Sequence, residues 1–343
     1  MPVSAAPDAS YLIGTNLYVK GVARDKRAEQ RARLTSIFTA RAKAGDTAII
    51  LDIPIFQSSW SSTDIGAKSP DTPSMDDVAW AVEQAHALGL IPIIKPLLDE
   101  ATIVATGPTG AWRGTIQPDD PDAWFASYTD LLAEYLRIAG TVEGSWLVIG
   151  AELGSLEASS YDGEWTQTIE TLHKTTTDHP VHLMYSQNWD MVGQVPDWFT
   201  DIDGLAISVF YPLKGASPDA SVDDLAALME GYTPVLDGIR EMMPGKTVIA
   251  GEAGIISSGD VYARPWAWSV DSADSLNMEA QRRYVVAACT TYAPHVDGIF
   301  WWTLYSDKSD DPAHDRGYSF EGKPAEREVN ACSATYGHPT AAG

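Results

Sequence analysis

Two glutamates occupy equivalent places in this sequence. Glu152 ends the run 145–152 (SWLVIGAE), and Glu252 ends the run 246–252 (KTVIAGE). Both runs are apolar and rich in residues that favour β-strands, so we expect each carboxyl group at the end of a strand. If parallel strands deliver both carboxylates to the same end of a barrel, the two can face each other across a sugar. Glycoside hydrolysis requires such a pair, one carboxyl as proton donor and the other as nucleophile or base.

Alternation along each strand predicts which way the glutamates face. Residues two apart point to the same side of a strand, which groups Glu152 with Val148. The same rule groups Glu252 with Val248 and Ala250. If those sides face the barrel axis, both carboxylates lie at the mouth. The alternative is that each glutamate caps a helix or pairs with an arginine at the rim, but two acids at matching strand ends favour a catalytic pair.

Aromatic and amide side chains stand at the ends of other predicted strands. Asn188 and Trp189 follow one strand, and Tyr211 follows the next. A phenol beside a carboxylate can hydrogen-bond it and favour its ionised form, and an indole can form a floor under a sugar ring. Trp301 and Trp302 are neighbours on the last strand and point opposite ways, so we expect one ring in the core and the other in the site. Core packing is the alternative for each ring.

Three more candidates belong to the segment around the third predicted strand. Lys95 ends that strand, and Trp112 and Arg113 lie in the loop after it. Cations at a barrel mouth could hold sugar hydroxyls or tune the acidity of the two glutamates. The alternative is that they only balance the acidic charge around them.

Apolar, β-rich runs alternate with helical segments along the whole chain. The predicted strands are 11–18, 47–53, 90–95, 146–152, 181–186, 205–210, 247–252 and 298–303. N-cap residues, helical apolar spacing and terminal glycines predict helices at 27–43, 75–88, 122–139, 164–177, 222–243, 278–292 and 323–334. This alternation predicts a (β/α)₈ barrel, with a doubly wound open sheet as the alternative. Long loops at 54–73, 96–121 and 211–221 would then build the active face.

Length and composition fit one globular domain with a neutral partner. A barrel of this type accommodates 343 residues, and no Pro-rich linker divides them, so we expect a single domain over 1–343 with flexible ends at 1–9 and 337–343. The net charge of −24 disfavours binding to nucleic acids, anionic lipids or polyuronates. No apolar run is long enough to span a membrane. A neutral oligo- or polysaccharide is compatible with these properties.

Other chemistries find little support. Gly245-Lys246-Thr247 resembles the end of a P-loop, but Arg240 replaces the required glycine and the lysine precedes a strand. The sequence has no G-x-S-x-G elbow. His179 and His182 have no third ligand at metal-binding spacing. We therefore expect neither a cofactor nor a metal.

The cysteines and the start of the chain leave two questions open. Cys289 lies in an apolar helical stretch and is predicted to be a buried thiol, although a bridge to Cys332 stays possible. The first seven residues, MPVSAAP, lack the charged and apolar regions of a signal peptide. The protein is then either cytoplasmic or one whose signal has been removed.

The sequence resembles glycoside hydrolase family 113, which comprises retaining β-mannanases with a clan-A (β/α)₈ barrel. The resemblance extends from Ile13 to Val329. It depends on the order of the segments 95–96, 112–114, 149–153, 185–189, 211–213, 251–254, 298–302 and 318–325, the last around Gly322-Lys323-Pro324.

The family pattern implies a role for each candidate. Glu152 becomes the acid/base, Glu252 the nucleophile, Tyr211 a hydrogen-bond partner of the nucleophile, and Trp302 the stacking residue of the subsite before the cleaved bond. The residues that would line the sugar subsites are Lys95, Trp112, Arg113, Asn188 and Trp189. Many clan-A enzymes place asparagine before the acid/base, where it binds the sugar 2-hydroxyl. Ala151 stands there in this chain, which leaves that hydroxyl to other groups.

The resemblance implies an endo-β-1,4-mannanase that cleaves neutral β-mannan or glucomannan by double displacement, and we expect it to be a monomer. Three alternatives stay open. The same mechanism could act on another neutral glycan, including furanosyl substrates, in an exo or endo manner. The barrel could bind carbohydrate without catalysis. A metal- or nucleotide-dependent enzyme is the last alternative.

Overall fold

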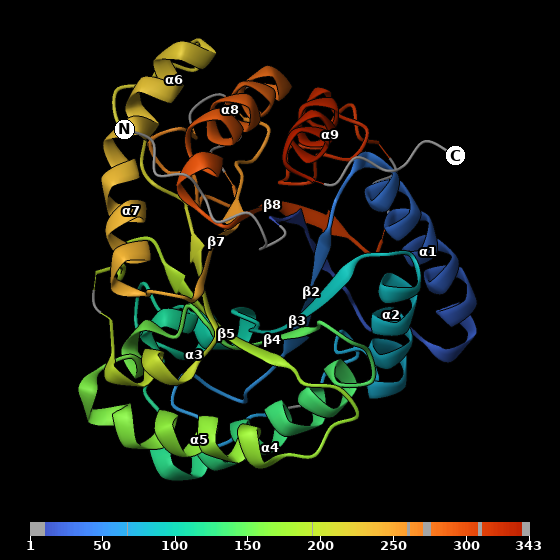
Figure 1. Cartoon of the computed structure of the whole chain (residues 1–343), viewed down its shortest axis with the longest axis vertical. Helices are drawn as coiled ribbons and strands as arrows, with labels where there is room; N and C mark the ends of the chain where they lie inside the picture. Colours follow the sequence, from blue (N-terminus) through green and yellow to red (C-terminus); the bar gives the residue numbers. More distant parts are fainter. Residues whose placement is uncertain are drawn as a thin grey trace.

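A closed barrel of eight parallel strands forms the centre of the molecule, with each strand hydrogen-bonded to the next in chain order (Figure 1). The computed structural model describes residues 11–66, 68–193, 195–258, 261–269, 276–307 and 311–337. The strands are β1 (Leu12–Tyr18), β2 (Ala48–Ile55), β3 (Ile91–Leu98), β4 (Trp146–Ala151), β5 (His182–Asn188), β6 (Gly204–Ser208), β7 (Thr247–Ala253) and β8 (Gly298–Tyr305). The predicted (β/α)₈ barrel is therefore confirmed, and the open sheet is excluded.

Helices surround the barrel and cover the outer faces of the strands (Figure 1). The α-helices are α1 (Arg27–Ala44), α2 (Met75–Ala87), α3 (Ala101–Thr106), α4 (Pro121–Ala139), α5 (Asp162–Lys174), α6 (Val222–Met229), α7 (Thr233–Met242), α8 (Met278–Thr291) and α9 (Pro324–Tyr336). Short 3₁₀ helices are η1 (Arg24–Lys26), η2 (Arg113–Thr115), η3 (Gly154–Leu156), η4 (Ser159–Tyr161), η5 (Asp197–Asp201), η6 (Glu230–Tyr232) and η7 (Ala293–His295).

One helix prediction and one loop prediction need correction. The helix expected over 222–243 is two helices, α6 and α7, joined by η6. Pro234 lies in the first turn of α7, where it cannot donate a backbone hydrogen bond and its ring would clash with the carbonyl four residues earlier in a continuous helix. The short helix α3 lies inside the loop expected over 96–121.

The inside of the barrel is filled by a small apolar cluster to which every strand contributes. Its buried members are Leu12, Ala48, Ile50, Ile93, Trp146, Val148, Met184, Ala206, Ile249 and Phe300. A far larger cluster fills the space between the strands and the helices. Because the interior is closed by this cluster, inward-facing residues further along the strands meet at the carboxyl-terminal mouth.

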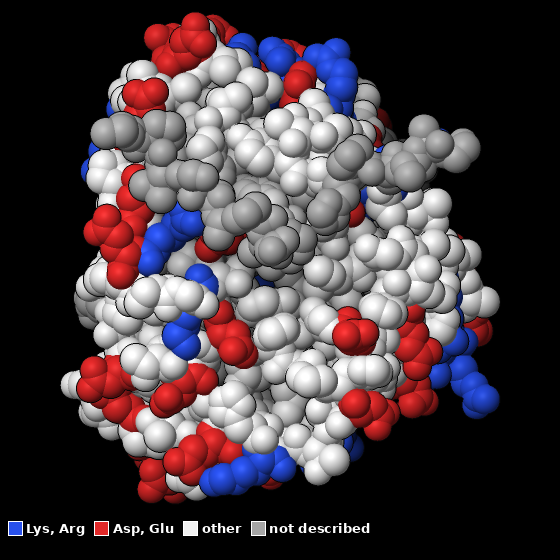
Figure 2. All heavy atoms as spheres, in the orientation of Figure 1, with Lys and Arg blue, Asp and Glu red and all other residues white. Residues whose placement is uncertain are grey.

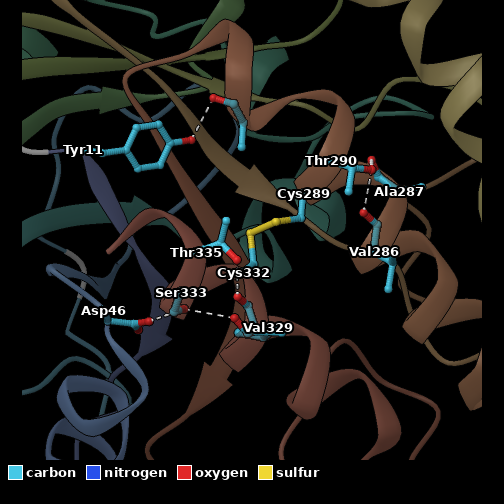
Figure 3. The surroundings of a disulfide bond; sticks show 12 residues. Tyr11, Asp46, Val286, Ala287, Cys289, Thr290, Val329, Cys332, Ser333 and Thr335 are labelled. Atoms are coloured by element: carbon cyan, nitrogen blue, oxygen red, sulfur yellow. Dashed lines mark hydrogen bonds between the residues drawn. A yellow bond between two sulfur atoms is a disulfide. The ribbon is translucent and has the colours of Figure 1, made fainter. Parts of the chain in front are cut away.

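A disulfide joins the last two helices of the ring. Cys289 of α8 is bonded to Cys332 of α9 across 43 residues of chain (Figure 3). The prediction of a buried free thiol at Cys289 is therefore wrong. The two sulfur atoms meet because α8 and α9 are neighbours in the ring, which the spacing of the cysteines could not indicate.

Acidic side chains are spread over the face seen in Figure 2, and basic ones lie among them; the whole chain has a net charge of −24. No helix in the described ranges is long and apolar enough to cross a membrane. The predicted flexible ends fall outside the described residues, except for Gly337, whose N–H donates to the Ser333 carbonyl at 2.7 Å. The single-domain organisation of the whole chain stays a prediction.

Candidate active site

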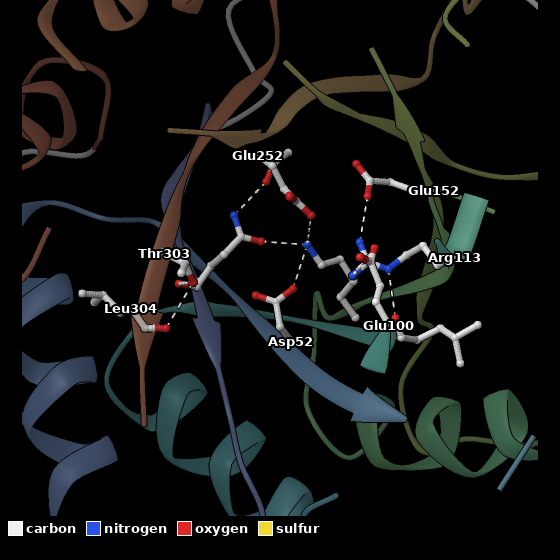
Figure 4. A network of polar contacts seen from close by, with 11 residues as sticks. Asp52, Glu100, Arg113, Glu152, Glu252, Thr303 and Leu304 are labelled. Atoms are coloured by element: carbon white, nitrogen blue, oxygen red, sulfur yellow. Dashed lines mark hydrogen bonds and ion pairs between the residues drawn. The ribbon is translucent and has the colours of Figure 1, made fainter. Parts of the chain in front are cut away.

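The structure brings Glu152 and Glu252 together at the mouth of the barrel. Glu252 is the sixth residue of β7, and Glu152 directly follows β4. Both residues are almost withdrawn from solvent: 6% of the surface of Glu152 and 4% of the surface of Glu252 are exposed. Figure 4 shows both carboxyl groups on one side of a polar network that also contains Asp52 and Arg113.

Glu252 faces the interior because β7 contains a bulge. Ile249 belongs to the inner cluster, so simple alternation would turn Glu252 outward with Val248 and Ala250. The register instead skips one residue: Ile207 pairs with Ala250, but Ser208 pairs with Glu252. The expectation that Val248, Ala250 and Glu252 share one side of the strand is therefore wrong. The expectation that the Glu252 carboxylate faces the inside of the barrel is correct.

The extra residue of the bulge is Gly251, and only glycine fits there. A Cβ atom on Gly251 would lie 2.7 Å from the Cβ atom of Ala206. The Gly251 carbonyl accepts a hydrogen bond of 2.8 Å from the Asn16 side chain. Both contacts fix the bulge, which re-aims the next side chain into the site.

Glu152 occupies a left-handed backbone conformation at the end of β4. Its φ of 57° is the only positive value among the described non-glycine residues. The Glu152 N–H donates to the Ser186 carbonyl at 2.7 Å, which holds the turn against β5. Uncommon conformations of this kind persist only where surrounding contacts enforce them, and they occur often at functional sites.

Lys95 connects the nucleophile candidate to two further residues. Its Nζ atom lies 2.6 Å from Glu252 Oε1 and 2.7 Å from Asp52 Oδ1. It also donates to Asn16 Oδ1 at 2.9 Å. Lys95 and Asp52 each stand two residues beyond a member of the inner cluster, so both point into the barrel. Sequence reasoning missed Asp52, although a lone acid inside an apolar strand was the same signal that marked the glutamates.

The buried charges of this cluster perturb one another. Burial raises the pKa of Glu252 to about 7; Lys95 opposes the rise, while Glu152 and Asp52 add to it. Burial favours the neutral amine of Lys95, but the carboxylates of Asp52 and Glu252 outweigh it and hold the pKa of Lys95 above its ordinary value. Lys95 is therefore an ammonium group, and its charge favours the ionised form of Glu252.

Arg113 forms an ion pair with Glu152. Its Nη1 atom lies 2.9 Å from Glu152 Oε2, and its Nη2 atom lies 3.1 Å from Glu100 Oε1. Its Nε–H donates to the Leu98 carbonyl at 2.9 Å, which fixes the plane of the guanidinium group. Among the described residues, Glu152 Oε1 has no hydrogen-bond partner, so this oxygen is open to a ligand.

The loop that carries Arg113 is shaped by its tryptophan. Trp112 is half-buried, and its ring lies so close to Gly114 that a Cβ atom there would be 2.3 Å from the indole. The Trp112 N–H donates to Thr115 Oγ1 at 3.1 Å. Trp112 thus lies next to the Arg113 end of the site, and its ring has a partly accessible surface.

Both tryptophans of β8 belong to the larger buried cluster, but their surroundings differ. Trp301 is buried in the outer cluster. Trp302 stands two residues beyond Phe300 of the inner cluster, and the Lys95 ammonium lies 5.0 Å from the centre of its ring. Trp302 therefore lies beside Lys95, whereas Trp301, also a candidate for substrate binding, is 1% exposed and points the opposite way, as neighbours on a strand do.

Tyr211 lies near the site but makes no bond to the nucleophile candidate. Its hydroxyl group is buried and has no hydrogen-bond partner among the described residues. Its ring stacks on Tyr232 at 4.4 Å and meets Trp189 edge-on at 6.0 Å. The hydrogen bond to Glu252 that the family pattern implied is absent from this structure.

Asn188 and Trp189 lie at the end of β5. The Asn188 side chain donates to Asp190 Oδ1 at 2.9 Å and accepts from the Trp189 N–H at 3.0 Å. Asn188 is thus occupied with shaping the turn that presents Trp189. Trp189 contacts the aromatic side chains around it, and both residues are half-buried.

A second buried acid, missed in the sequence, supports the turn after Glu152. Glu157 accepts hydrogen bonds from the Tyr185 hydroxyl at 2.9 Å and from the Gln187 amide at 2.6 Å. The Tyr185 oxygen in turn accepts the Leu153 N–H at 3.2 Å. Burial raises the pKa of Glu157. Its position five residues after Glu152 offered no periodic signal that could have revealed this role.

The described residues include no group of three or more His, Cys, Asp or Glu side chains arranged to hold a metal ion. The site instead consists of two carboxyl groups, each paired with a fixed cation, beside aromatic rings. This arrangement can transfer a proton from one carboxyl and offer the other as a nucleophile.

Comparisons with known proteins point the same way. The model of Glycoside Hydrolase Family 113 matches residues 20–323. The GH113 β-mannanase AaManA from Alicyclobacillus acidocaldarius is 22% identical to this chain, with a TM-score of 0.78 over 96% of this chain and 99% of that one. A further GH113 β-1,4-mannanase structure is 21% identical, with a TM-score of 0.75 over 95% and 99% of the two chains. None of the curated proteins matches the sequence.

A more distant likeness extends the same architecture. The endo-β-1,4-mannanase from Thermotoga petrophila is 12% identical, with a TM-score of 0.55 over 96% of this chain and 77% of that one. At these identities, the solved structures share the barrel with this chain.

Proposed function

Because this chain belongs to glycoside hydrolase family 113, we propose that it is an endo-β-1,4-mannanase that acts on neutral β-mannan or glucomannan with retention of configuration. It is a glycoside hydrolase by family, and the proposal concerns its substrate, its mode of cleavage and its stereochemistry. The solved relatives of the same family are β-mannanases, which supports the choice of substrate.

The observation that carries the mechanism is the pairing of each glutamate with its own cation. Lys95 lies 2.6 Å from Glu252 and favours its ionised form, as a nucleophile needs. In the described part of the chain, Arg113 contacts only the Oε2 atom of Glu152. The Oε1 atom can then hold the proton that is transferred to the leaving oxygen. Two carboxyls at one barrel mouth thus occupy different environments and suit different roles.

The proposed reaction has two steps. The Glu252 carboxylate attacks the anomeric carbon while the bond to the leaving oxygen breaks and Glu152 gives its proton to that oxygen. Glu152, now a carboxylate, then takes a proton from water, whose oxygen attacks the anomeric carbon and displaces Glu252. Both carboxyl groups return to their starting states, and one water molecule is consumed.

Substitution of the two glutamates tests the assignment. Glu152→Gln and Glu252→Gln should each lower turnover on mannan by at least about 10³-fold while the thermal unfolding temperature stays near that of wild type. The matched control is Glu143→Gln, because Glu143 is exposed and lies before β4, at the opposite end of that strand from Glu152. Variants that hydrolyse mannan like wild type would rule out the pair.

Two measurements separate the finer parts of the proposal. A panel of mannan, glucomannan, xylan, β-glucan, arabinan and galactan oligosaccharides tests the substrate, and preferred cleavage of any glycan without mannose contradicts it. Proton NMR of the first product tests the stereochemistry. Retention gives the β-anomer first, and an initial α-anomer would mean that water attacks directly.

A further inference from the structure

Two tryptophans outside the predicted site are exposed at the barrel mouth. Trp266 and Trp268 lie between β7 and α8, and 41% and 57% of their surfaces are accessible. Large aromatic rings usually bury most of their surface. The other large hydrophobic residues exposed in the described part of the chain are aliphatic: Val104, Val235 and Met242. The two rings therefore mark this segment as unusual.

Both exposed rings touch aromatic residues of the candidate active site. Trp266 stacks on Trp189, with 5.4 Å between ring centres and 22° between planes. Trp268 meets Trp302 edge-on, at 6.1 Å and 87°. Trp302 in turn faces the Lys95 ammonium at 5.0 Å. The aromatic surface is thus continuous with the network that holds the nucleophile candidate.

The backbone that carries the two rings is anchored. The buried Tyr318 donates its hydroxyl to the Pro265 carbonyl at 2.6 Å, directly before Trp266. The Ala267 N–H donates to the Arg264 carbonyl at 2.9 Å, which closes a turn that contains Trp266. The Tyr318 ring also contacts Trp268 at 5.1 Å. Rings held in this way lose little conformational freedom when a ligand binds.

We propose that Trp266 and Trp268 form a sugar-binding platform, a further subsite region for pyranose units of the glycan beyond those at the cleaved bond. An indole face covers the apolar C–H face of a pyranose ring, and the exposed rings offer such faces beside Trp189 and Trp302. The occupant is a neutral mannan chain, because a net charge of −24 repels acidic polymers. This inference depends on the mannanase function proposed above.

The platform predicts that the tryptophans matter for long substrates and not for short ones. For Trp266→Ala and Trp268→Ala, kcat/KM on mannohexaose should fall about tenfold, equivalent to about 1.4 kcal/mol, chiefly through a higher KM. On mannotriose the same variants should stay within about twofold of wild type. Trp266→Tyr keeps an aromatic face and should recover part of the loss on mannohexaose.

Met242→Ala provides the control, since Met242 is similarly exposed but ends α7 at the opposite end of the barrel. An equal loss on both substrates would assign the tryptophans a structural role and overturn the proposal, as would no loss on either. If wild type cleaves mannotriose and mannohexaose but the variants show no length dependence, the platform fails while the mannanase function stands. If wild type cleaves no mannan, both fall.

Discussion

The contact between Lys95 and Glu252 leads to a prediction about how activity depends on pH. The ammonium group lies 2.6 Å from Glu252 and 2.7 Å from Asp52. Burial raises the pKa of Glu252 to about 7, and Lys95 opposes that rise. Because Lys95 favours the carboxylate form, Lys95→Met must raise the pKa of Glu252 further.

The size of the effect follows from the separation of the charges. An opposite charge within about 4–6 Å lowers the pKa of a carboxyl group by about 1–3 units. Its loss should therefore move the acidic limb of kcat/KM from about 7 to between about 8 and 10. With a shift of about two units, the ionised fraction of Glu252 falls about a hundredfold at pH 6 and changes little at pH 10. Lys95→Met should thus lose most activity in acid and least in alkali.

The assay is kcat/KM on mannohexaose measured from pH 5 to 10. Lys174→Met is the control, because it removes an exposed lysine paired with Glu170 on α5. A loss of the same size at every pH would refute the reasoning. Since Lys95→Met leaves two buried carboxylates without their cation, Asp52→Asn gives an independent test: removing the Asp52 charge lowers the pKa of Glu252, so the acidic limb should move down. A limb that stays or moves up contradicts the network.

Three further predictions follow from other contacts. Glu157→Gln should lower the free energy of unfolding by about 1–3 kcal/mol in a denaturant titration and reduce kcat, because one of the two donors to Glu157 then faces an amide NH2 group instead of an acceptor oxygen and the turn after Glu152 loosens; unchanged kcat would leave Glu157 with a role in stability alone. Tyr211→Phe should keep or raise the unfolding temperature, because the buried Tyr211 hydroxyl has no hydrogen-bond partner among the described residues. If that hydroxyl binds substrate, the same variant should lower kcat/KM about tenfold. Unchanged kinetics would exclude such a contact. Cys289→Ser opens a loop of 43 residues and should lower the free energy of unfolding by about 4 kcal/mol. For this 343-residue chain, that corresponds to a fall of about 5 °C in the unfolding temperature measured by calorimetry. Reduction of the wild-type protein with dithiothreitol should cause the same fall.

The barrel could be predicted because its signals are local. Continuous apolar runs such as β4, in which every residue is buried, indicate strands covered on both faces. Caps such as Ser74, whose side chain accepts the Asp77 N–H, indicate where helices begin. The break between α6 and α7 was missed because helical spacing continues through it, although Pro234 was visible.

The candidate site could be predicted only in part. Strand ends pointed to Glu152 and Glu252, and the parallel barrel brings such ends together. The partners of these acids come from other strands and loops: Asp52 through Lys95, and Glu100 through Arg113. Which cation meets which acid depends on side-chain positions across the mouth, and spacing along the chain does not encode it.

The sequence by itself determined the number and order of the strands and the two acids at their ends, because apolar periodicity and strand termination act over a few residues. The tertiary structure decided the rest. The inward direction of Glu252 depends on a register shift that Gly251 permits only against Ala206 of the neighbouring strand. The charge state of that carboxyl depends on Lys95, and the Cys289–Cys332 bond depends on two helices lying side by side. Each is a contact between distant parts of the chain, formed only when the barrel closes.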